Sequence, residues 1–149
     1  MSIITMIRIG ADGQQLAEGS TEKHVAVLFP QIGWLLTATV ICTEEQSQTE
    51  LLETAKKLDL LGHTDWELAP IELLKMATDH SRYSPAFNPE FFHDIPIDWI
   101  WSSTEVEWSR DNKTGVAASA WFVHSSSGDV SYNHRLNSGF GLAARRVGQ

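Results

Sequence analysis

The stretch between the last two apolar runs carries the densest set of side chains that could bind a ligand. It reads YNHRLNS, so an aromatic ring, amides, an imidazole and a guanidinium follow one another closely. Adaptable polar groups beside a tyrosine are typical of recognition surfaces, but a solvated hairpin connection explains the same composition equally well. The stretch therefore predicts either a solvated loop or a binding surface formed by Tyr132, Asn133, His134, Arg135 and Asn137.

Tryptophans and a polar loop supply a second group of candidates. Strand alternation places Trp99 and Trp101 on one face, and indole rings both stack on sugars and anchor protein interfaces. Trp108 follows shortly, ahead of the sequence DNKTG, which is typical of an exposed loop tip. This loop adds Asp111 and Asn112 to the expected binding surface.

The residues that catalysis or metal binding would need are scattered. The six histidines show no HxxxH or HxH spacing, so a zinc site would have to be assembled by the fold. Cys42 ends an apolar strand pattern, where a buried, unreactive thiol is expected. The segments 88–90 and 111–115 carry oxygen ligands but are typical of turns rather than of a calcium loop. The sequence predicts no enzyme, no metal site and no cofactor.

The composition indicates one domain spanning residues 1–149. Hydrophobic residues make up 42% and charged residues 20% of the chain, and no window is long and apolar enough to span a bilayer. The N-terminal sequence is typical of a first strand rather than a secretion signal, and a single cysteine is unusual for a small secreted domain. We expect a cytoplasmic protein of a bacterium or an infected host cell, with no membrane partner.

The charge limits the classes of partner. Nineteen acidic residues against eleven basic ones give a net charge of −8, which repels nucleic acid backbones and anionic membranes. Direct binding to nucleic acid is therefore not expected. The same charge would suit a basic protein surface, including one that normally holds DNA or RNA.

The first half of the chain shows strand patterns followed by two helical ones. Strands are expected over Ile3–Ile9, His24–Phe29 and Trp34–Cys42. A helical period starts behind Thr43 as its cap and stops at Gly62. A second helix is expected over Ile71–Asp79, behind Pro70.

The second half consists of short apolar islands separated by turn residues. Strands are expected over residues 99–102, 118–124, 130–133 and 140–147, and Ser125–Asp129 joins two of them as a hairpin turn. Helices placed early and an antiparallel, loop-rich second half predict an α+β domain.

A series of short blocks along the chain resembles the Lcl C-terminal domain family. The blocks are a Trp-Xaa-Leu segment that leads into a helix with Glu-Leu, a Pro-Ala-Phe-Asn segment ending in Phe-Phe, a Trp-Ser-Ser-Thr segment, a Trp-Phe-Val strand before a Gly turn, and a terminal Ala-Arg-Arg. The resemblance covers about residues 24–147 and leaves the N-terminal strand 3–9 outside it. The chain departs from the family at Glu67, where an Arg is usual, and in lacking the cysteine pairs of secreted members.

The resemblance implies a C-type-lectin-like fold, with two helices, small antiparallel sheets and long loops that present ligand-binding residues. Trp66 and Trp101 fall on motif positions and look structural, which leaves Trp99 and Trp108 as the exposed candidates. The chain looks like the stand-alone members that occur in phage and prophage genomes.

Together these observations predict a non-enzymatic binding module of phage or prophage origin. It would recognise a protein or glycan through the loops around Trp108–Asn112 and Tyr132–Asn137, and replacing Tyr132 and Arg135 by alanine should weaken binding but hardly change the thermal midpoint. The alternative is an intracellular anti-defence inhibitor, of the anti-CRISPR kind, whose acidic surface binds a host nucleic-acid-binding protein.

Overall fold

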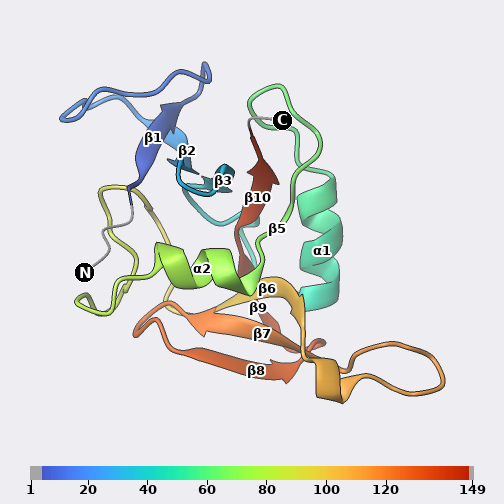
Figure 1. Cartoon of the computed structure of the whole chain (residues 1–149). Helices are drawn as coiled ribbons and strands as arrows, with labels where there is room; N and C mark the ends of the chain where they lie inside the picture. The colour runs from blue at the N-terminus through green and yellow to red at the C-terminus, as the bar shows by residue number, and fades with distance from the viewer. Residues whose placement is uncertain (1–4, 148–149) are drawn as a thin grey trace.

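Two helices and two five-stranded sheets make up the α+β fold that the sequence predicted, within residues 5–147 that this computed structural model describes (Figure 1). The first sheet is antiparallel throughout, and its strands in spatial order are β1 (Ile7–Gly10), β2 (His24–Phe29), β3 (Trp34–Thr37), β10 (Ala143–Arg146) and β5 (Glu67–Leu68). Neither helix among the described residues combines the length and the apolar sequence that crossing a membrane requires.

The second sheet is antiparallel except for one parallel pair. Its strands in spatial order are β4 (Gln46–Ser47), β9 (Ser138–Gly141), β6 (Trp99–Glu105), β7 (Ser119–His124) and β8 (Val130–His134). The parallel pair is β6 with β9. The expected hairpin is confirmed, because β7 and β8 pair across the turn at Ser125–Asp129.

The helices begin and end at positions that differ from the expected ones. Helix α1 (Gln48–Lys56) is capped by Ser47 rather than Thr43, because the Ser47 side chain accepts from the Glu50 amide while Glu50 accepts from the Ser47 amide. Helix α2 (Ile71–Ala77) starts behind Pro70 as predicted. It ends at Ala77, two residues earlier than expected, and Thr78 is its C-cap.

Strand boundaries differ as well. β1 starts at Ile7, and the expected start at Ile3 lies outside the described residues. β3 ends at Thr37 instead of continuing to Cys42. The run expected as one strand over 140–147 is two strands, because the chain leaves the second sheet after Gly141 and enters the first sheet at Ala143.

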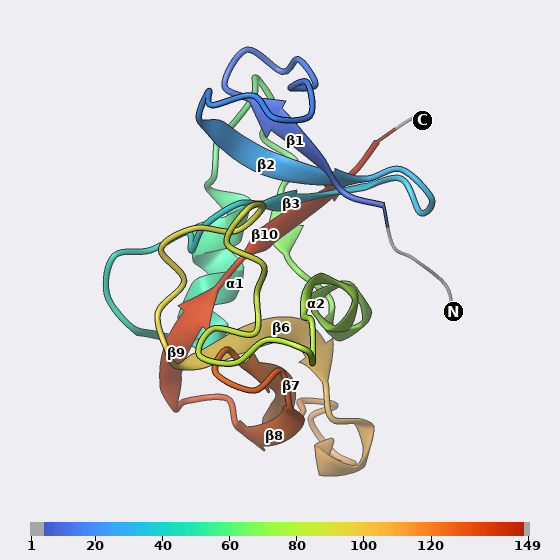
Figure 2. The same ribbon diagram turned by 90° about the vertical axis from the view of Figure 1, so that its left-hand side faces the viewer.

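The central strands of both sheets bury side chains on both faces, so β2, β3 and the first half of β6 read as nearly continuous apolar runs. Ile100, Leu36 and Ala144 join a core around α2, whereas their neighbours Trp101, Leu35 and Ala143 join a second core that includes Leu51 and Ala55 of α1. Figure 2 shows α2 end-on between the first sheet and the second. The two helices thus fill opposite sides of the same strands.

Two glycines in β9 allow this packing. A Cβ on Gly139 would lie 2.8 Å from the Trp99 carbonyl oxygen, and one on Gly141 would lie 2.8 Å from the Leu68 Cδ1 atom. A Cβ at Gly139 would push β9 away from β6, and one at Gly141 would displace the Leu68 side chain of β5. The Gly-Phe-Gly sequence is therefore a packing requirement of the junction between the sheets.

Candidate functional site

Three aromatic rings form an exposed cluster at the β8 side of the second sheet. Trp121 of β7 lies directly across from Tyr132 of β8, and Trp108 from the short 3₁₀ helix η1 (Glu107–Ser109) packs against both. The ring centroids are 5.3 to 5.7 Å apart and every pair meets edge to face. Trp108 is 69% exposed and Tyr132 is 47% exposed. We call Trp108, Trp121 and Tyr132 the aromatic cluster.

The β7–β8 hairpin brings these rings together. Its register pairs Val123 with Val130 and Trp121 with Tyr132, so alternation places all four side chains on one face. Helix α2 packs against β6 and β7 on this face, where Val123 is fully buried. Beyond β7, the five residues of β8 are all exposed. The cluster therefore lies where the cover of α2 ends.

Hydrogen bonds fix η1, and with it Trp108, against the start of β7. The Ser109 hydroxyl donates to the Val106 carbonyl at 2.6 Å and accepts from the Ser119 amide at 3.1 Å. Val106 in turn donates its amide to the Ser119 carbonyl at 2.9 Å. Trp108 is thus an exposed ring on a fixed backbone, which lowers the entropy lost on binding.

Arg110 ties the two acidic residues of this region to the loop after η1. Its guanidinium donates to Glu107 at 3.2 and 3.1 Å, to Glu105 at 2.9 Å and to the Gly115 carbonyl at 2.6 Å. The hydrogen bond from Arg110 and its charge hold the pKa of Glu107 below its ordinary value. Glu107 and Glu105 reciprocally raise the pKa of Arg110.

Asp111 and Asn112 both lie in the exposed loop that follows, as predicted. The Asp111 Oδ1 atom accepts from the amides of Lys113 and Thr114 at 2.7 and 3.0 Å. These amide hydrogen bonds lower the pKa of Asp111, with Thr114 contributing most. The Asp111 Oδ1 atom thus closes its own loop.

Arg135 has a structural role that the sequence did not reveal. Its Nε donates to the Gln48 side chain at 2.7 Å, and its Nη1 donates to Glu105 and to the Ala117 carbonyl, both at 3.2 Å. Only 15% of the side chain is exposed. The expectation that Arg135 can be removed without loss of stability is at odds with these contacts, because the side-chain oxygen of the fully buried Gln48 would lose its donor.

The remaining candidates are divided between two faces. Trp99 is half-buried rather than exposed, because it stacks on Phe122 at 4.5 Å and meets Trp101 edge to face on the side opposite the cluster. Asn133 alternates to that same opposite side, and it accepts from Asn137 at 2.9 Å. His134 lies on the face of Tyr132, and its Nδ1 accepts from the Leu136 amide at 3.3 Å. The structure thus joins Tyr132 with Trp108 and separates both from Trp99 and Asn133.

Trp121 is the member of the cluster that the binding surface expected from the sequence does not include. It begins the Trp-Phe-Val block of the family pattern. The signal that could have found it is the hairpin itself, because a four-residue loop, Ser125–Gly128, pairs His124 with Asp129 and so places Trp121 opposite Tyr132. The alternation rule then puts both rings on one face.

Groups with nucleophilic or metal-binding chemistry are held in ordinary structural roles. Burial raises the pKa of the Cys42 thiol, which lowers its reactivity. The Ser126 hydroxyl lies 2.7 Å from His124 Nδ1, but the Ser126 amide donates to the same nitrogen at 3.2 Å, so the pair closes the hairpin turn. Within residues 5–147, His, Cys, Asp and Glu side chains do not gather in threes that could hold a metal ion.

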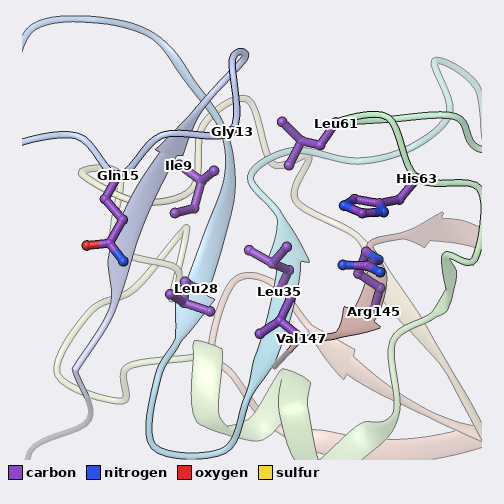
Figure 3. A pocket seen from close by; sticks show the side chains of 9 residues that line it. All are labelled: Ile9, Gly13, Gln15, Leu28, Leu35, Leu61, His63, Arg145 and Val147. Atoms are coloured by element: carbon purple, nitrogen blue, oxygen red, sulfur yellow. The ribbon is translucent and has the colours of Figure 1, made fainter. Parts of the chain in front are cut away.

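A separate groove of about 270 Å³ lies on the first sheet (Figure 3). Its lining is mainly aliphatic, with His63 and Arg145 at one end. Arg145 donates to both carboxylate oxygens of Asp65, at 2.7 and 3.1 Å, and this lowers the pKa of Asp65. The charge of Arg145 is therefore balanced, and the groove offers a ligand apolar contact more than charge.

Comparison with known proteins identifies one family. The model of the Lcl C-terminal domain matches residues 24–145, which include both helices, all of β2 to β9 and every residue of the aromatic cluster. No curated protein matches the chain.

Proposed function

We propose that this chain, which belongs to the Lcl C-terminal domain family, is a non-enzymatic binding module that uses the aromatic cluster as its recognition surface. The observation that carries the proposal is the exposure of Trp108, at 69%, on a backbone that hydrogen bonds hold in place. Large rigid aromatic side chains supply contact area at a small entropic cost, and they dominate the energetics of recognition.

The surroundings of the cluster supply the polar groups that a ligand needs. Asn112 and one carboxylate oxygen of Asp111 are available in the loop after η1, and His134 adjoins Tyr132 along β8. We infer, in addition, that the fold is C-type-lectin-like, since its two helices, mostly antiparallel sheets and long loops fit that description. In that fold the loops of this half would present the ligand-binding residues, and a phage or prophage origin is part of the proposal.

The test compares wild type with two single variants, Trp108→Ala and Tyr132→Ala, on a glycan array and on a library of displayed random peptides. Leu136→Ala is the matched control, because Leu136 is equally exposed, at 69%, but stands outside the cluster. We expect ligands that bind wild type and the control and lose affinity for both cluster variants. Ligands that bind all four proteins equally, or an absence of ligands in both libraries, would refute the proposal.

A second candidate function follows from the net charge of −8. An acidic chain of this kind could inhibit a host nucleic-acid-binding protein inside the cell by occupying its basic surface, as anti-CRISPR-like inhibitors would. Association steered by charge weakens steeply as salt rises. A complex that forms from host lysate at low salt, dissociates at high salt and blocks nucleic acid binding would support this role, whereas a salt-insensitive glycan complex would exclude it.

A further inference from the structure

The outer edge of β8 carries backbone groups without a strand to pair with. β8 is the last strand of the second sheet, and no described residue forms a strand beyond it. Edge strands with open hydrogen-bonding groups are templates for another strand, and proteins usually block them with Lys, Pro or a bulge. β8 reads VSYNH, so it has neither Lys nor Pro, and its pairing with β7 is regular.

The hydrogen bonds at the two ends of the hairpin show which residues face outward. His124 donates to Asp129 and Arg135 donates to Ala118, so the hydrogen-bonded pairs include residues 129 and 135. In an antiparallel ladder these pairs alternate with non-bonded ones. Ser131 and Asn133 therefore bond to β7, and Val130, Tyr132 and His134 direct their amide and carbonyl groups away from it.

The contacts of His134 confirm this direction and mark where the open edge ends. Its amide donates to the Asn133 side chain at 2.7 Å, and its carbonyl accepts from the Asn137 amide at 3.1 Å. Both groups of His134 are thus occupied by the chain itself. The open part of the edge is Val130–Tyr132.

We propose that the partner of the aromatic cluster is an extended, basic polypeptide segment that adds to the second sheet as a strand beside Val130–Tyr132. Its backbone would exchange hydrogen bonds with Val130 and Tyr132, which is the general chemistry of strand addition. A side chain opposite Tyr132 would lie about 5 Å from it, within reach of the ring and of Trp108. This inference rests on the proposed function and names its ligand class.

Charge selects a basic segment. Glu105, Glu107, Arg110 and Arg135 balance one another, but Asp129 stands exposed immediately before β8, and the chain as a whole carries −8. A Lys or Arg on the added strand would also gain a cation–π contact with the exposed rings. A second copy of the chain is disfavoured as the occupant, because two copies of charge −8 repel each other.

The experiment uses the full chain, random peptides displayed on phage, and synthetic copies of the selected peptides. Val130→Pro removes an outward amide without breaking a bond to β7, because proline is tolerated where the N–H faces solvent, and Val130→Thr keeps the amide. We expect selected peptides rich in Lys or Arg that bind wild type and Val130→Thr alike and bind Val130→Pro about tenfold more weakly. Circular dichroism checks that each variant is folded.

A second measurement changes the peptide instead of the protein, so its result does not depend on whether a variant folds. Two versions of a selected peptide would be made, one methylated at the odd-numbered amide nitrogens and one at the even-numbered ones. Only one of these two sets faces β8 in an added strand, so only one version should lose its binding to wild type. Strand addition is overturned if both methylated versions still bind wild type, or if Val130→Pro binds the peptides as well as wild type does. If only Trp108→Ala loses binding, strand addition is likewise overturned, but the aromatic cluster remains the binding surface. Selection of acidic peptides or of none, or self-association that Val130→Pro abolishes, also overturns the proposal.

Discussion

The Nε atom of Arg135 donates to the Oε1 atom of Gln48 at 2.7 Å, and this bond joins the segment after β8 to the first residue of α1. Gln48 also donates two hydrogen bonds. Its backbone amide donates to the Arg135 carbonyl at 2.9 Å, and its side-chain nitrogen donates to the Ser102 carbonyl at 3.0 Å. The pair therefore ties together α1, β6 and the end of the hairpin that carries the aromatic cluster.

Replacing Arg135 by alanine should lower the free energy of unfolding by about 2–4 kcal/mol, because Gln48 and Glu105 would lose a charged donor in a largely buried site. Arg146→Ala is the matched control. Its guanidinium lies 4.6 Å from the centroid of the Trp34 ring on an exposed strand end, so it should cost less than about 1 kcal/mol. Urea midpoints of both variants measure the difference, and equal losses would contradict the structural role of Arg135.

Replacing single tryptophans by alanine should lower the free energy of unfolding more for buried tryptophans than for the exposed Trp108. Trp66 and Trp101 are 2% and 0% exposed, and their indole nitrogens donate to Leu60 and Asn137 carbonyls. Their change to alanine should each cost about 3–5 kcal/mol, whereas Trp108→Ala loses two edge-to-face contacts and should cost about 1 kcal/mol. Denaturant midpoints of the three variants decide this, and a Trp108 variant as unstable as the others would place that ring in the core.

Adding a methyl group to each glycine of β9 should destabilise the chain to different degrees. At Gly139 the new Cβ meets a backbone oxygen, the Trp99 carbonyl, whereas at Gly141 it meets the ends of the Leu68 and Leu51 side chains. Side chains can shift more readily than a paired strand, so Gly139→Ala should cost more, about 2–3 kcal/mol, than Gly141→Ala. Thermal midpoints in the reverse order would show that β9 moves more easily than its neighbours.

Stability should fall as the pH drops below neutral, in part through His24. Burial is the main cause that lowers the pKa of His24 below its ordinary 6.5, and it outweighs the hydrogen bond with the Phe91 carbonyl. Between the lowered folded value and the ordinary unfolded one, the unfolded chain binds more protons, so stability is complete above about pH 6.5 and is lost as the pH falls through the folded pKa. In His24→Gln the urea midpoint should vary less between about pH 7 and pH 5; an unchanged dependence would assign the effect to other groups.

The elements that the sequence predicted well are those decided by local chemistry. Pro70 and the apolar positions Leu73, Leu74 and Ala77 defined α2, and the serine-rich turn defined the β7–β8 hairpin. The start of α1 was misplaced because Thr43 and Ser47 can both cap a helix. What decides between them is the reciprocal bond with Glu50 and the pairing of Gln46 with Gly139, and the second of these is a contact between distant parts of the chain.

The candidate site was predicted only in part for the same reason. The exposure of Trp108 and the loop position of Asp111 follow from neighbouring residues, and both were anticipated. The burial of Arg135 depends on Glu105 and Gln48, which are 30 and 87 residues away. The half-buried state of Trp99 depends on Phe122 across the sheet. The local sequence shows that Arg135 is polar and Trp99 aromatic, but contacts with distant parts of the chain determine whether these side chains face solvent.

The passage of the chain from β9 to β10 sets the order of events during synthesis. β9 lies between β4 and β6, and β10 lies between β3 and β5, so the last strands to leave the ribosome occupy interior positions in both sheets. Neither sheet is continuous until residues 138–146 have emerged. Folding of the two layers should therefore follow the emergence of residues 138–146 as one event instead of proceeding from the N-terminus. A nascent chain stalled before Ser138 should stay sensitive to protease along its whole length.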